Sequence, residues 1–250
     1  MTVYVFTGPT LPAEDARKEL RAEYLPPVSE GDVYRVTLKK PVAIGIIDGY
    51  FENVPSVWHK EILYALSRGV HVFGASSMGA LRAAELATFG MEGVGAIFQA
   101  YRDGHLEDDD EVAVTHGPAE LGFPLLSEAM VSIRRTLSDA CAANILTEAS
   151  RQSLESTAKA LHYRERTYGH IVAEAAEAAV PSVELERFKS WLPTGRVDQK
   201  REDALLMLRT MRDRFKGKPP VKQVQFHFEH TLHWEQATRV SGQGHRPGSA

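Results

Sequence analysis

The sequence predicts an α/β fold with a parallel Rossmann-like sheet in the N-terminal half and a helical C-terminal half. Short apolar runs alternate with helical patterns over about the first 90 residues, which is typical of parallel strands joined by right-handed crossovers. The strands are expected at Val3 to Phe6, Val42 to Ile47 and Val70 to Phe73. The second run is almost continuously apolar and rich in β-branched residues, as in a strand covered on both faces.

Helices are expected between and after these strands. Pro55 suits the first position of a helix whose apolar residues run to Leu66, and Gly69 ends that helix. Residues 30–41 are interpreted as a connection. The other helices expected in this half cover residues 13–20, 78–86 and 94–101.

Beyond residue 126 the pattern is helical as far as Phe215. We expect helices at 126–145, 148–180 with a break near Tyr168, 183–191 and 200–215. Val221 to Trp234 alternates between apolar and polar residues, which predicts an exposed strand. The expected organisation is a core α/β domain at 1–137, a helical region at 138–216, a linker with an edge strand at 217–241 and a disordered tail at 242–250.

Composition narrows the classes of partner. The chain has 250 residues, of which 43% are hydrophobic and 25% charged, as in an ordinary globular protein. Its net charge of −4 gives no reason to expect nucleic acid as a partner. No apolar run reaches the roughly 20 residues of a membrane span, and no signal peptide precedes the first strand. We therefore expect a cytoplasmic protein, and its single cysteine, Cys141, excludes an internal disulfide.

The strongest chemical signal lies at the carboxyl edge of the predicted sheet, where active crevices form. Ala75 to Gly79 fits a small-x-Ser-x-Gly elbow, a strained turn that exposes a nucleophilic serine. Ser77 is the expected nucleophile, because only it has a glycine two places later. Backbone N–H groups near Met78 and Gly79 would stabilise an oxyanion. The alternative is that Ser76 or Ser77 simply caps the helix.

A nucleophilic serine needs a base, and His59 and Lys60 begin the preceding helix. Lys60 pairs with Ser77 in this interpretation; in the alternative it extends into solvent. Asp48 and Glu52 either orient Lys60, bind a partner or cap the helix that follows. The acidic residues 107–111 are interpreted as a solvated turn that could meet a basic partner. No metal-ligand spacing and no dinucleotide fingerprint is present, so we expect no metal and no cofactor.

Several ordered motifs together resemble the TfuA-like family over about residues 1–137. The longest is Gly74-Ala-Ser-Ser-Met-Gly-Ala-Leu-Arg-Ala-Ala-Glu-Leu86. The others are Val57-Trp-His-Lys-Glu-Ile62, Phe89-Gly-Met-Glu-Gly-Val-Gly95, Asp109-Asp-Glu-Val-Ala113 and the turn Thr7-Gly-Pro-Thr10.

The resemblance implies a hydrolase-like accessory protein of peptide backbone thioamidation. Such a protein releases sulfide from a thiocarboxylated, ThiS-type ubiquitin-like carrier through a Ser-Lys pair and assists a YcaO-type cyclodehydratase. The resemblance implies that the serine of this pair is Ser77, or its neighbour Ser76, and that the lysine is Lys60. Asp48, His59 and Arg82 are expected as binding residues. Two alternatives stay open: a non-catalytic adaptor that uses the same crevice to bind the carrier or the YcaO-type enzyme, and a domain that binds a small molecule.

Overall fold

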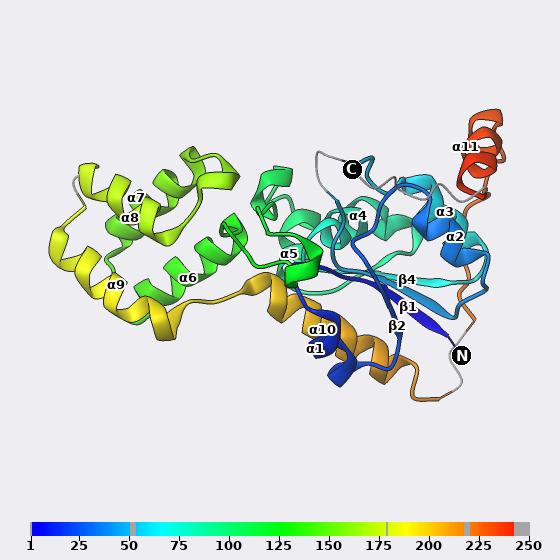
Figure 1. The fold of residues 1–250 in the computed structure, drawn as a ribbon, viewed down its shortest axis with the longest axis horizontal. Coiled ribbons are helices and arrows are strands. Elements are labelled where there is room, and N and C mark those ends of the chain that lie inside the picture. The colour runs from blue at the N-terminus through cyan, green and yellow to red at the C-terminus, as the bar shows by residue number, and fades with distance from the viewer. Residues whose placement is uncertain (1, 51–53, 179, 218–220, 243–250) are drawn as a thin grey trace. The chain divides into compact units, whose positions relative to one another are not determined.

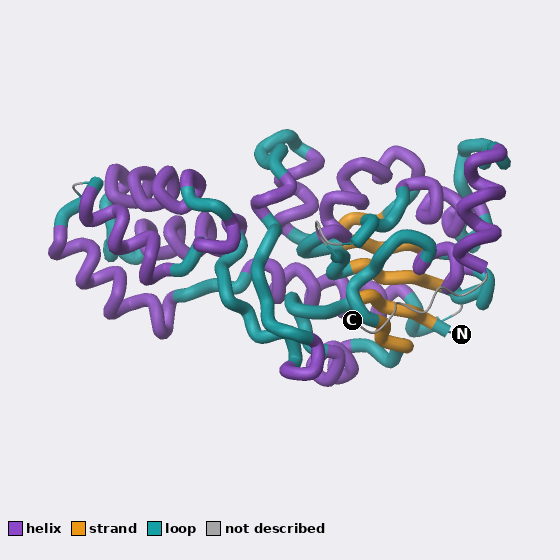
Figure 2. Tube along the Cα trace, turned by 45° about the horizontal axis from the view of Figure 1, so that its top comes forward, coloured by secondary structure: helices purple, strands orange, loops and turns teal. Residues whose placement is uncertain are grey.

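The computed structural model describes residues 2–50, 54–178, 180–217 and 221–242 (Figures 1 and 2). Its contacts divide the chain into two compact units. The first comprises residues 1–105 and 203–250, and the second comprises residues 106–202. The chain thus leaves the first unit, builds the second, and returns.

A five-stranded, fully parallel sheet forms the centre of the first unit, which confirms the predicted α/β class. The strands are β1 (Val3–Phe6), β2 (Glu23–Leu25), β3 (Ala43–Ile46), β4 (His71–Gly74) and β5 (Glu92–Gly93). Their order is β2-β1-β3-β4-β5. In this doubly wound order the strands are added first on one side of β1 and then on the other, so the switch point lies between β1 and β3. In such sheets ligands bind beyond the carboxyl ends of the strands at that point.

Helices cover both faces of the sheet. Three of them, α2 (Asp32–Thr37), α3 (His59–Ser67) and α4 (Met78–Leu86), lie on one side, and α1 (Ala13–Glu19) and α10 (Gln199–Arg214) lie on the other (Figure 1). The packing of α10 is close, because a Cβ on Gly45 of β3 would lie 3.1 Å from atoms of both Met207 and Met211. The first unit also contains η1 (Ala87–Phe89), α5 (Ala96–Arg102) and α11 (Leu232–Gly242).

The second unit is helical. Its helices are α6 (Met130–Ala142), α7 (Glu148–Ala160), α8 (Tyr168–Glu177) and α9 (Ser182–Gly195), with single turns η2 (Asp109–Glu111), η3 (Ala119–Leu121) and η4 (Tyr163–Glu165). Buried side chains from all four helices, among them Ile133, Leu154, Ile171 and Phe188, form one apolar core. The expected break near Tyr168 falls at the start of α8, so the helical prediction for this part holds.

Several expectations about individual elements are wrong. Residues 30–41 contain α2 rather than only a connection, and α3 begins at His59 rather than Pro55. Residues 221–231 form no strand; they are an irregular segment with a bend at 225–226 and lead into α11. The short strands β2 and β5 have too few residues to produce a periodic signal.

The contacts also divide the chain at other positions than the sequence suggests. The unit boundary lies at 105/106 rather than after residue 137, and most of α10 belongs with the sheet rather than with the helical region. The expected tail at 243–250 lies outside the described residues.

Candidate functional site

The loops after β1, β3 and β4 meet at the carboxyl edge of the sheet, and Asp48 ties two of them together. Its carboxylate accepts hydrogen bonds from the backbone N–H groups of Gly8 and Thr10 at 2.9 and 3.0 Å and from the Thr10 hydroxyl at 2.5 Å. Asp48 is fully buried. It therefore holds the loop after β1 and neither caps α3 nor contacts Lys60, contrary to two of the roles considered for it. Glu52 lies outside the described residues.

The turn from β4 into α4 places the two serines differently. Ser76 has a φ of +68°, in the left-handed region that non-glycine residues rarely adopt, and its side chain is fully buried. Ser77 occupies the N-cap position of α4 but makes no capping hydrogen bond, and it is partly exposed. Within the described part of the chain, the Ser77 hydroxyl has no hydrogen-bond partner. Its hydroxyl is thus accessible and uncommitted.

Gly79 packs α4 against the sheet. A Cβ on Gly79 would lie 1.8 Å from the carbonyl oxygen of Ile46, so only glycine fits there. The Gly79 N–H already donates to the Ile47 carbonyl at 3.3 Å. The Gly79 N–H is therefore already engaged and is not free to bind an oxyanion, contrary to the expectation. The Met78 N–H donates to no described backbone carbonyl and stays a candidate.

The structure does not bring Lys60 to the serines. The Lys60 ammonium donates to the Thr231 hydroxyl at 3.0 Å and lies 5.6 Å from the centre of the Phe228 ring. Among the described residues it forms no hydrogen bond with Ser76 or Ser77. Lys60 thus contacts the C-terminal segment of the chain.

His59 and Arg82 join the start of α3 to α4 through Glu85. The Glu85 carboxylate lies 2.7 Å from Nε2 of His59 and 2.8 Å from Nη1 of Arg82. Burial by itself would raise the pKa of Glu85, but the hydrogen bonds from His59 and Arg82 outweigh it, so the pKa lies below its usual value. Arg82 also donates to the Val57 carbonyl at 3.1 Å. His59 and Arg82, two of the three expected binding residues, thus fix the chain around the start of α3.

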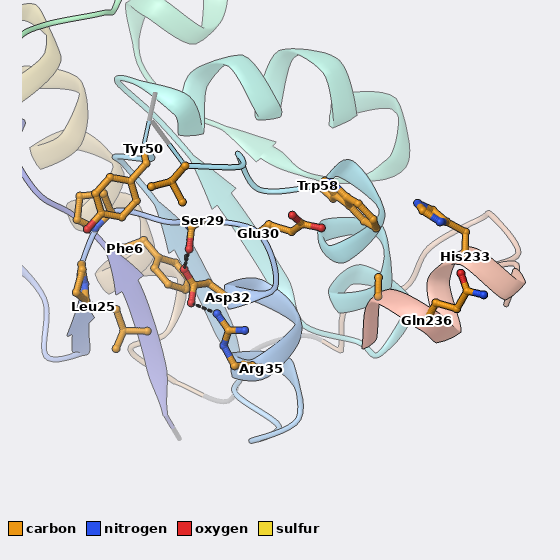
Figure 3. Close-up of a pocket in the computed structure, with 14 residues that line it drawn as sticks. Phe6, Leu25, Ser29, Glu30, Asp32, Arg35, Tyr50, Trp58, His233 and Gln236 are labelled. Atoms are coloured by element: carbon orange, nitrogen blue, oxygen red, sulfur yellow. Dashed lines mark hydrogen bonds and ion pairs between the residues drawn. The ribbon is translucent and has the colours of Figure 1, made fainter. Parts of the chain in front are cut away.

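A cavity of about 780 Å³ lies at the carboxyl edge of β1 and β2 (Figure 3). That volume falls within the range of small-molecule sites, which favour such sheet edges. Trp58 and His233 contribute stacked rings with centroids 5.3 Å apart. The remaining lining residues are Phe6, Leu25, Pro26, Pro27, Ser29, Glu30, Asp32, Arg35, Tyr50, Val54, Gln236 and Ala237. Sequence reasoning missed this cavity, because its walls come from segments without a shared motif.

Glu61 is a second residue that the sequence did not single out. Its buried carboxylate accepts from the backbone N–H groups of Gly31 and Tyr34 at 2.8 and 3.1 Å, and so caps α2 from a neighbouring helix. It also accepts from the N–H of Trp58 at 3.3 Å, the N-cap of its own helix. Burial raises the pKa of Glu61. This carboxylate shapes one side of the cavity by fixing where α2 and α3 begin.

The acidic residues 107–111 are solvated only in part: Glu107, Asp108 and Asp109 are exposed, whereas Asp110 and Glu111 pack against basic side chains. Glu111 is buried and pairs with Arg134 at 2.9 Å and with Lys159 at 3.0 Å. Asp110 accepts from Lys159 and from Arg166, each at 2.5 Å. The basic partners of this acidic cluster therefore belong to the second unit itself.

The described residues were compared with the requirements of a metal centre and of a membrane span. Within the described ranges, no three His, Cys, Asp or Glu side chains gather as metal ligands would. In the same ranges, no helix combines the length and apolar character needed to cross a bilayer.

Comparison with known proteins identifies one family. Residues 48–167 match the family described as TfuA-like protein. A search of curated proteins gave no match. The matched segment starts at Asp48, after β1, β2 and β3, and extends through η4 of the second unit, farther along the chain than the motifs suggested. Over residues 48–167, which carry Lys60, Ser76 and Ser77, the chain is similar to TfuA-like proteins.

Proposed function

We propose that this protein is an accessory factor of peptide backbone thioamidation that acts with a YcaO-type enzyme and releases sulfide from a thiocarboxylated, ThiS-type carrier. The observation that carries the proposal is the uncommitted hydroxyl of Ser77 at the start of α4. It lies at the sheet edge where parallel α/β proteins carry their chemistry, and within the segment that matches the TfuA-like family.

Ser77 suits the nucleophile better than Ser76. A nucleophile has to reach the substrate carbon, and the side chain of Ser76 is fully buried whereas Ser77 is partly exposed. The left-handed backbone of Ser76 contributes in another way, because it bends the chain sharply enough to present the next residue at the helix start. Ser76 is therefore a positioning residue in this mechanism.

The reaction begins when Oγ of Ser77 attacks the thiocarboxyl carbon at the carrier's C-terminus. The hydroxyl proton passes by way of the Lys60 amine to the departing sulfur, so that the C–S bond breaks and hydrosulfide leaves. Water then attacks the acyl ester, which returns a carboxylate carrier and regenerates the serine. The Met78 N–H would hold the oxyanion, an interaction worth about 3 kcal/mol per donor. This proton transfer requires Lys60 to give up its hydrogen bond to Thr231 and turn toward Ser77.

The test is sulfide release from the purified thiocarboxylated carrier in the absence of any YcaO-type enzyme. Ser77→Ala should lower the rate by about a thousandfold or more, because the nucleophile is lost. Ser67→Ala is the matched control; its hydroxyl bonds the Tyr64 carbonyl within α3, and it should retain the wild-type rate. Wild-type sulfide release by Ser77→Ala would exclude Ser77 as the nucleophile.

The adaptor function is the second candidate, and the position of Lys60 favours it. A lysine that contacts Thr231 and Phe228 rather than a serine is not arranged as a base. In that case the wild-type protein releases no sulfide from the carrier by itself, yet thioamidation by the YcaO-type enzyme still requires it. Measuring both reactions with the same preparation separates the two functions.

A further inference from the structure

The segment 221–231, here called the strap, lies on the first unit between α10 and α11, outside any helix or strand and with a bend at residues 225–226 (Figure 1). Its residues alternate in exposure from 221 to 229: even-numbered residues are partly buried and odd-numbered residues are exposed. In an extended chain successive side chains point to opposite sides. One side of the strap therefore faces the protein.

Each inward side chain meets a particular partner. Lys222 donates to Glu92 at 3.2 Å. A Cβ on Gly90 would lie 3.9 Å from the Val224 side chain. The ring of Phe226 meets that of Phe89 edge-on at 5.8 Å, and Phe228 meets Tyr64 at 5.4 Å. We call the row formed by Glu92, Gly90, Phe89 and Tyr64 the track.

Side chains alone hold the strap on the track. Among the described residues, no backbone hydrogen bond joins residues 221–230 to the rest of the protein. The strands of the sheet, by contrast, are joined through their backbones. Recognition by the track therefore depends on which side chains occupy every second position, and its occupant can leave without breaking the sheet.

We propose that the track is a binding surface for an extended peptide and that the strap occupies it in cis. The matching partner segment has a basic residue followed by apolar side chains at the second, fourth and sixth positions after it, with aromatic rings at the last two. The tethered strap competes with such a partner at a high effective concentration. Partner binding thus requires the strap to leave.

Departure of the strap would also change the candidate site. Thr231 would release the Lys60 ammonium, and His233 and Gln236 of the following helix would move from the wall of the cavity. Binding of a partner peptide to the track would therefore change access to the cavity at the sheet edge. The peptide-binding property itself does not depend on whether Ser77 releases sulfide.

The experiment uses the full chain and a fluorescein-labelled peptide with the sequence of residues 221–231. Replacing Phe226→Ala and Phe228→Ala together weakens the strap in cis, so this variant should bind the peptide at least about tenfold more tightly than wild type. The matched control replaces the exposed neighbours, Gln225→Ala and His227→Ala, and should bind as weakly as wild type. Fluorescence anisotropy measures the affinities.

A second peptide tests the alternation. It has the same composition, but its two phenylalanines are moved by one residue to positions 225 and 227, which turns both rings to the opposite side. The double variant should bind this peptide at least about tenfold more weakly. Adding Tyr64→Ala to the double variant should abolish the tight binding while the circular dichroism stays unchanged. Equal affinity of wild type and double variant, or equal affinity for both peptides, would overturn the proposal.

Discussion

At the scale of single residues, buried carboxylates do structural work at the edge of the sheet. Asp48 accepts three hydrogen bonds from the loop after β1, and Glu61 accepts backbone N–H groups from two helix starts. A buried N–H that loses its acceptor costs about 1–3 kcal/mol. These two carboxylates therefore determine how the loops around the cavity are placed, whereas the hydroxyl of the partly exposed Ser77 holds no loop in place.

Asp48→Ala should lower the free energy of unfolding by about 3 kcal/mol, because the N–H groups of Gly8 and Thr10 lose their acceptor. The comparison is Asp103→Ala, which removes an exposed pair with Arg102 and should cost less than about 1 kcal/mol. Urea unfolding followed by circular dichroism measures both. An equal loss in the two variants would show that Asp48 has no special role.

At the scale of elements, α4 approaches the sheet closely because two glycines face each other. A Cβ on Gly74 of β4 would lie 2.1 Å from the carbonyl oxygen of Gly79, and a Cβ on Gly79 would collide with β3. The bend at Ser76 lets the chain turn directly from β4 into this helix. The position of Ser77 thus follows from how near α4 lies to the strands.

Gly79→Ala should destabilise the first unit by about 3 kcal/mol, because α4 has to move away from β3 to make room for the methyl group. Gly169→Ala on α8 provides the contrast, since nothing lies within 4 Å of a Cβ there and alanine favours a helix. Thermal unfolding should show a clear decrease for the first variant and no decrease for the second. A normal melting temperature for Gly79→Ala would refute the close contact.

At the scale of the molecule, the chain builds two units with different sources of stability. The first rests on a parallel sheet covered on both faces, whereas the second combines an apolar core with a network of ion pairs. Burial would raise the pKa of Asp110, but hydrogen bonds from Lys159 and Arg166 outweigh it and place the pKa below its ordinary value. Acid should therefore weaken this network.

The sign of the pH effect follows from linkage. Asp110 binds a proton less readily in the folded protein than in the unfolded chain. Its contribution to the free energy of unfolding is therefore complete above about pH 5 and is lost as the pH falls below about 4. Asp110→Asn should be less stable than wild type at pH 7, and the difference should shrink by pH 3. Asp139→Asn, in an exposed pair on α6, should show little difference at either pH. Urea midpoints at both pH values provide the measurement, and a constant difference for Asp110→Asn would contradict the assignment.

Local patterns anticipated much of the first unit. The apolar runs at β1, β3 and β4 and the glycine that ends α3 are signals carried by a few consecutive residues, so the strand–helix alternation could be predicted. The turn at Ser76 and Ser77 was recognised for the same reason. The alternation is also present in the structure over residues 221–229, but there it arises from one side of an irregular segment that packs on other elements rather than from a strand in a sheet.

The sequence by itself determined the class of fold, the serine-bearing turn and the resemblance to TfuA-like proteins, because each depends on neighbouring residues. Only the tertiary structure decided that α10 covers the second face of the sheet, that Asp48 holds a loop and that Lys60 contacts Thr231. The residues that meet in these contacts lie about 40 to 170 positions apart in the chain. Periodicity carries no information on such distant pairs, which are set by the packing of whole elements.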